Sequence, residues 1–267
     1  NGLLILLFII LSLLTADSGK LTLSGIFLGF ALSKYNLAFP VFIFFIIKKE
    51  YRILIMAIIV QLIGLVLLSS ITVDSSPIQI FQDYLTIALY HQLNLSGSSG
   101  INISSYLPKT IILSIFAFIG TTAPLVIVYQ KKFKKSNGYI NDDKKVELSL
   151  LSALLLWGLL CVYHLGYDTI LAIIPILYLI LVLENDRENI YNYFYKFYLA
   201  SISLVICLLI IPGSIYRSIF SYKNASIIAI TIAIILLFIL ICIYSIFYNN
   251  RESNLRKNAN SDPLPCG

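Results

Sequence analysis

Charged residues are scarce in this sequence. Asp, Glu, Lys and Arg make up 12% of its 267 residues, against about 25% in ordinary soluble domains. Apolar residues make up 59%, and they form runs of about 15–24 residues along nearly the whole length, as membrane spans do. The sequence therefore predicts an all-α, polytopic integral membrane protein with about 8–9 membrane segments.

Several common kinds of site are also missing. The four cysteines have the spacing of neither a disulfide framework, a metal site nor a redox motif. There is no phosphate-binding glycine loop, no nucleophile elbow and no HExxH zinc motif. The net charge of +6 sits in short loops between apolar runs, which indicates membrane topology rather than nucleic-acid binding. We therefore expect no metal, no cofactor and no nucleic-acid partner.

The start of the chain has neither an initiator methionine nor a signal peptide. The single methionine is Met56, and Asn1 leads directly into the apolar run Gly2–Leu14, with no basic segment before it and no cleavage site after it. We expect the N-terminal part of a longer protein to be missing. Residues 1–248 are predicted to form a single transmembrane helical domain, and residues 249–267 a disordered cytoplasmic tail.

The predicted spans share a continuous apolar composition and lie at Leu3–Leu14, Leu21–Ile47, Ile53–Ile71, Thr110–Tyr129, Leu148–Val162, Ile170–Leu183, Tyr198–Ile211 and Ala225–Tyr248. Residues 72–108 form a predicted extracytoplasmic loop, in which Ile78–Leu93 has the spacing of an amphipathic interfacial helix. Basic clusters mark the predicted cytoplasmic side; they lie at Lys48–Arg52, Lys131–Lys145, Arg187–Lys196 and Arg251–Lys257.

The stretch Gly25–Pro40 holds a lysine, Lys34, between two apolar runs. A lysine at membrane depth costs roughly 2.5–3.5 kcal/mol on insertion scales, so it is a candidate for function. Pro40 lacks the backbone donor that would bond the carbonyl of Asn36, which favours a helix break. A single helix over Leu21–Ile47 would be about 40 Å long, beyond a hydrocarbon core of about 30 Å. We therefore expect a hinge at Lys34–Asn36.

A resemblance to a known family rests on this stretch and on three other elements. GxxLGxAL, followed by Lys34 and Pro40, resembles the signature of glycosyltransferase family 87, which belongs to the GT-C superfamily. The Asn102-x-Ser104 pair resembles the family's N-x-S element before a helix. YHLGYDTILAIIP, with His164, Tyr167 and Asp168, is similar to its YD…LLLP element, and Asn1 is similar to the end of its G-(Q)-x-N element.

The resemblance implies a GT-C-like transmembrane core in the bacterial plasma membrane. It implies transfer of a sugar, such as mannose or another hexose or pentose, from a polyprenyl-phosphate donor to a lipid or glycan acceptor on the extracytoplasmic face. The substrate-binding residues that it implies are Lys34, Asn36, His164, Tyr167, Asp168, Asn102 and Ser104. No acidic residue matches the family's general base, so no catalytic residue is assigned and this chain alone is expected to be inactive.

Other interpretations of the same residues stay open. A transporter or flippase for a lipid-linked or anionic solute would use Lys34 as a substrate counter-ion at a broken helix. A purely structural membrane subunit is a third possibility. In that case Lys34 is a lysine at a span end whose amine reaches the headgroups, and Tyr167 belongs to an interfacial aromatic belt.

Overall fold

The computed structural model of the chain describes residues 2–72, 76–94, 100–101, 140–161, 164–185, 192–210, 215, 218 and 228–243. These residues are helical apart from one pair of two-residue strands, β1 (Gly100–Ile101) and β2 (His164–Leu165). The predicted helical class is therefore confirmed for the part of the chain that is described. The predicted span Thr110–Tyr129 and the predicted tail lie outside the described residues.

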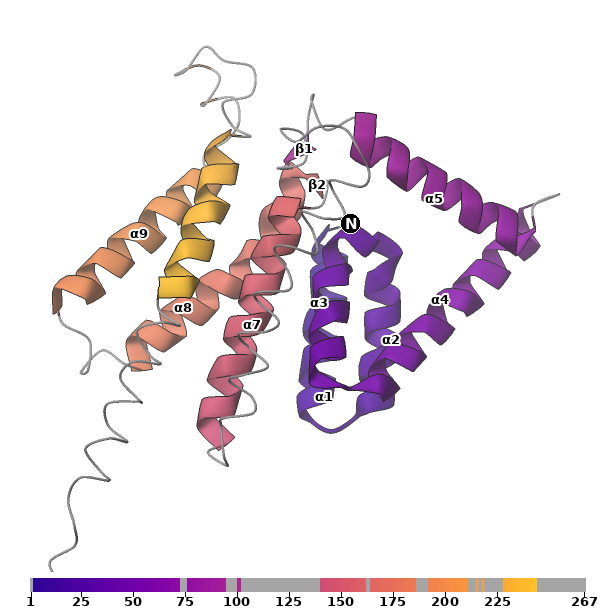
Figure 1. The fold of residues 1–267 in the computed structure, drawn as a ribbon, viewed down its shortest axis with the longest axis horizontal. Coiled ribbons are helices and arrows are strands. Elements are labelled where there is room, and N and C mark those ends of the chain that lie inside the picture. Colours follow the sequence, from indigo (N-terminus) through magenta and orange to yellow (C-terminus); the bar gives the residue numbers. More distant parts are fainter. Residues whose placement is uncertain are drawn as a thin grey trace, which may run out of the picture.

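The first four helices form one side of the molecule (Figure 1). They are α1 (Gly2–Asp17), α2 (Leu21–Ala31), α3 (Tyr35–Lys48) and α4 (Tyr51–Ile71). Helices α1 and α2 run antiparallel, and the buried hydroxyls of Ser12 and Ser24 lie 3.1 Å apart between them. Helices α2 and α4 run in the same direction, because Gly25 lies against Ile53 and Gly29 against Val60.

Glycine permits the close approach of α2 to α4. A Cβ atom added to Gly25 would lie 2.6 Å from the carbonyl oxygen of Ile53, and one added to Gly29 would lie 2.6 Å from the Cβ of Val60. Small residues let membrane helices pack backbone to backbone in this way. The Gln61 side chain adds a polar link by donating a hydrogen bond of 2.5 Å to the Gly29 carbonyl.

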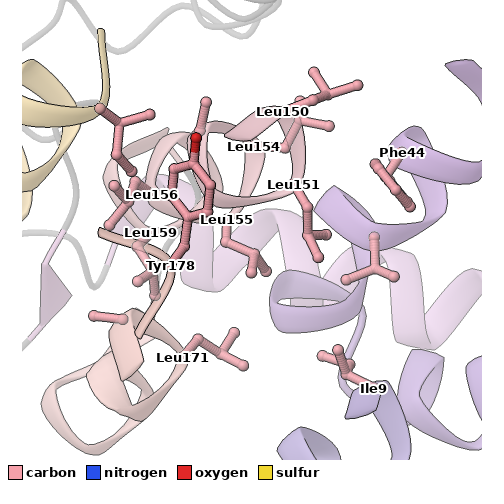
Figure 2. Close-up of a cluster of buried hydrophobic side chains, with 14 of the residues drawn as sticks. Ile9, Phe44, Leu150, Leu151, Leu154, Leu155, Leu156, Leu159, Leu171 and Tyr178 are labelled. Atoms are coloured by element: carbon pink, nitrogen blue, oxygen red, sulfur yellow. The ribbon is translucent and has the colours of Figure 1, made fainter. Parts of the chain in front are cut away.

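Helix α7 (Ile140–Cys161) is the centre of the core. Its residues 149–159 are all buried, as expected of a helix that is apolar on every side. Figure 2 shows Leu151 pointing toward α3 and α1, near Phe44 and Ile9, while Leu156 and Leu159 lie on the other side with Tyr178. The helix thus joins α1–α3 to the second half of the chain.

The second half adds a 3-10 helix, η3 (Gly166–Ala172), then α8 (Ile173–Asn185) and α9 (Asn192–Ile210). An apolar helix at Ile228–Ile243 follows, and it lies beside α9 in Figure 1. The Tyr198 hydroxyl donates a hydrogen bond of 3.4 Å to the Leu240 carbonyl between these last two helices.

The predicted starts of two helices were wrong. Helix α7 begins at Ile140 rather than at Leu148, and α9 begins at Asn192 rather than at Tyr198. Charged side chains in the first turns of α7 find partners on other helices: Lys144 pairs with Asp17, and Glu147 with Lys48. These tertiary contacts stabilise helical turns whose composition alone is typical of a polar loop.

By length and composition, one helix in the described part of the chain can cross a membrane. This is α4, with 21 residues. The other apolar helices are shorter, at 10–17 residues, so the predicted count of 8–9 spans is not supported by helix length. Side chains of α4 such as Ile55, Leu62 and Val66 are more than half exposed. The structure therefore establishes a helical fold with one candidate span.

Candidate functional site

The predicted hinge in Leu21–Ile47 is confirmed, but it lies earlier than expected. Helix α2 ends at Ala31, a 3-10 turn η1 (Leu32–Lys34) follows, and α3 begins at Tyr35. Lys34 itself has the non-helical backbone angles φ −121° and ψ 75°. The two halves fold back on each other, since the start of α2 and the end of α3 both lie near the start of α4.

Pro40 is not the cause of the break. It sits inside α3, and its ring lies directly against Gly158 of α7, where any side chain would collide with it. The proline therefore fits a helix that has already begun at Tyr35, and its missing backbone donor is tolerated there. The chain turns instead at Leu32–Lys34, which places Lys34 immediately before the first turn of α3.

Lys34 lies partly buried at the end of the helical pair, opposite the end that holds Lys48. The next residue, Tyr35, contacts Tyr84 of α5 (Pro77–Asn94), with ring centroids 5.6 Å apart in an edge-to-face arrangement. Burial, followed by the neighbouring Tyr35 phenol, raises the pKa of Tyr84 to about 12. Tyr84 therefore stays neutral at physiological pH.

A second part of the predicted site is brought together by the two short strands. Strand β1 pairs with β2 in antiparallel register, Gly100 opposite Leu165 and Ile101 opposite His164. Gly100 and Ile101 thus lie beside His164 and Leu165, although the two pairs are about 60 residues apart in sequence. Sequence patterns of two residues are too short to predict such a pairing.

The start of the predicted span Ile170–Leu183 differs in the structure. Tyr167 and Asp168 belong to η3, and the α-helix α8 begins only at Ile173. The segment η3 packs against α1 and α7, and its Leu171 is fully buried in the cluster of Figure 2. This packing anchors the backbone around Asp168 to the core.

The seven predicted substrate-binding residues are described to different extents. Lys34 is placed completely, whereas for Asn36, His164, Tyr167 and Asp168 only the backbone position is described. Asn102 and Ser104 lie outside the described residues. Lys34 and Asn36 share the η1–α3 junction, while the strand pair and η3 hold the other described members.

Two further features were not expected from the sequence. The Tyr35–Tyr84 contact ties α5 to the η1–α3 junction, and the lone glutamine of α4, Gln61, bonds α2. The sequence could have indicated the Gln61 bond, because Gln61 is an isolated amide in an apolar run. In the described part of the chain, His, Cys, Asp and Glu side chains form no cluster that could hold a metal ion.

The arrangement is suited to holding an anion at the η1–α3 junction. An ammonium group precedes a helix whose first residues present backbone N–H groups, and the positive end of the helix dipole favours negative charge. No side chain caps the start of α3 through a hydrogen bond in the described structure. Comparison of the chain with protein-family models, with curated proteins and with solved structures finds no significant match.

Proposed function

We propose that the protein is a membrane glycosyltransferase that uses a polyprenyl-phosphate sugar as its donor. The observation that carries the proposal is the position of Lys34. It lies at a helix break, directly before the first turn of α3, at the end of the helices opposite the basic residues Lys48 and Arg52. A lysine and a helix start at one point are suited to a phosphate.

The exposed apolar surface supports a location in the membrane. Large apolar side chains are exposed along most of the helices, including Leu3 (69%), Leu67 (58%) and Leu204 (52%). Exposed apolar surface of this extent marks an interaction with lipid or with other proteins. A multi-pass arrangement, with a GT-C-like core and the polyprenyl chain lying along these helices, is part of the proposal.

In the proposed reaction the acceptor hydroxyl attacks the anomeric carbon of the donor sugar. The bond from that carbon to the phosphate oxygen breaks, and the hydroxyl proton passes to a base. Lys34 stabilises the negative charge that develops on the departing lipid phosphate. Ile101 pairs with His164 in the short sheet, and Asp168 follows in η3. In the proposal His164, Asp168 and Asn102 contact the sugar.

The test compares the full-length wild-type protein with its Lys34→Met and Lys34→Arg variants, because this chain alone is expected to be inactive. Transfer of labelled sugar from synthetic polyprenyl-phosphate donors is measured per folded molecule in proteoliposomes. Lys34→Met keeps most of the length and apolar surface of the side chain, and we expect a loss of roughly 10²–10³-fold, as for a single oxyanion-stabilising donor. Lys34→Arg retains charge with a different donor geometry, so we expect partial activity.

Three outcomes would contradict the proposal. If the full-length wild-type protein transfers sugar from no polyprenyl-phosphate donor, the protein is not such a transferase. Unchanged turnover in Lys34→Met removes Lys34 from the site. A Lys34→Met protein with altered insertion but normal turnover per folded molecule indicates instead a lysine that only anchors the helix end in the headgroups.

A further inference from the structure

A second candidate binding site lies at the other end of the helices, away from Lys34. A hollow of about 320 Å³ is lined by Gly19, Lys20, Leu21, Thr22, Leu23 and Arg52. It is formed where the turn between α1 and α2 meets the first turn of α4. Its volume is at the small end of the range of about 300–1,000 Å³ that is usual for ligand sites.

Two cations line this hollow, and the structure gives them no acidic partner within the described residues. Near them, Lys48 pairs with Glu147 at 2.7 Å and Lys144 with Asp17 at 3.2 Å. Neither Lys20 nor Arg52 takes part in a salt bridge of the described part of the chain. Lys20 and Arg52 therefore give the hollow a positive charge that no salt bridge of the described residues neutralises.

An uncharged residue with a hydroxyl group, Thr22, also lines the hollow. Lys20 is the residue before α2, and its side chain makes no capping hydrogen bond to that helix. An arginine adds a planar fork of donors that matches phosphate geometry, while a lysine adds a compact charge. Two cations and a threonine that line the same hollow are a donor set for one phosphate group, and the helix start only adds to it.

The surroundings of the hollow indicate a lipid as the bearer of that phosphate. Leu21 and Leu23 line it as well, and Leu23 is 39% exposed. The adjoining face of α4 is apolar and open, with Ile55 57% exposed. A headgroup in the hollow would therefore leave its acyl chains beside an apolar helix surface. We propose that this hollow, between Lys20 and Arg52, binds the phosphate of an anionic lipid headgroup.

This site is independent of the proposed transfer reaction, and its test uses binding alone. Isothermal titration calorimetry of the whole protein in uncharged detergent measures three probes: dihexanoyl phosphatidic acid, dihexanoyl phosphatidylcholine and inorganic phosphate. Heats of dilution into empty micelles are subtracted. We expect phosphatidic acid to bind more tightly than the other two. Its phosphate has no neighbouring cation, unlike that of phosphatidylcholine, and it carries acyl chains, unlike inorganic phosphate.

The variants Lys20→Gln and Arg52→Gln identify the site. Each should weaken the binding of phosphatidic acid by about fivefold, the effect expected for one basic residue near a lipid surface. Lys144→Gln is the matched control: it removes the same charge at the same end, but Lys144 belongs to the pair with Asp17 and not to the lining. Helical circular dichroism checks that all three variants fold.

Each result decides a part of the proposal. Loss of affinity in the two lining variants and not in Lys144→Gln supports the hollow as the site. An equal loss in all three variants overturns it, since the whole basic end would then act as a diffuse charge. Unchanged affinity in the lining variants overturns it too. If inorganic phosphate binds as tightly as phosphatidic acid, the site binds free phosphate and the proposal of a lipid ligand is wrong.

Discussion

Single glycines decide how closely the first helices pack. Gly25 and Gly29 lie one turn apart on the face of α2 that meets α4, and both approach it more closely than a side chain would allow. Gly64 of α4 also lies in an apolar run, but a Cβ atom there would meet nothing within 4 Å. Glycines in the same pair of helices therefore have different roles: Gly25 and Gly29 permit close packing, and Gly64 does not contribute to it.

The contrast gives a matched pair of substitutions. Gly25→Ala forces a methyl group against the Ile53 backbone, and overpacking of this kind costs roughly 1–3 kcal/mol. Gly64→Ala should be neutral or stabilise by up to about 1 kcal/mol, because alanine is the better helix former. Thermal unfolding in detergent, followed by circular dichroism, measures both. Equal stability of the two variants would show that α2 and α4 do not pack as described.

Among the elements, the turn at η1 does most to shape the candidate site. It converts one apolar stretch of 27 residues, Leu21–Ile47, into two helices that lie side by side. Helix α3 then meets α7 from Pro40, which lies against Gly158, to Lys48, which pairs with Glu147. Because residues 149–159 of α7 are buried, this contact fixes α3, and with it the junction that carries Lys34, relative to the core.

The folded-back arrangement can be measured directly. Nitroxide labels at Leu23→Cys and Ile46→Cys, both on exposed positions, would be about 35 Å apart in one continuous helix. We expect pulsed electron resonance to give a clearly shorter distance, with the four native cysteines replaced. Pro40→Ala should keep the short distance, because the turn lies at Leu32–Lys34. A distance near that of a continuous helix would refute the turn.

At the scale of the whole molecule, charge and apolar surface are separated. Asp17, Lys20, Lys48, Arg52 and Lys144 gather at one end of the helices, while exposed apolar side chains cover much of the length of α4. Two of the predicted basic clusters, those containing Lys48 and Lys144, therefore lie at the same end. This is the arrangement that a membrane with this end in the cytoplasm would require.

Accessible cysteines test that orientation. Ser18 and Ser76 are both exposed and lie beyond opposite ends of α4. In a background without the native cysteines, a membrane-impermeant maleimide added to intact cells should modify Ser76→Cys and leave Ser18→Cys unmodified until the cells are broken. Modification of Ser18→Cys alone would reverse the orientation. Modification of both in intact cells would show that α4 does not cross the membrane.

The sequence by itself determined the helical class, the helix boundaries of α4 and α5 to within two residues, and the existence of a break near Lys34. These depend on composition and spacing within a few turns, which is local information. It also identified Lys34 as a candidate functional residue, because a lysine between apolar runs is unusual whatever surrounds it.

Only the tertiary structure decided where the break lies and what meets it. Pro40 stays inside α3 because Gly158 leaves room for its ring, and α7 begins early because Asp17 and Lys48 offer partners to its first turns. The pairing of Ile101 with His164 depends on how the helices between them are packed. Such contacts join residues far apart in the chain, and no local pattern specifies which faces will meet.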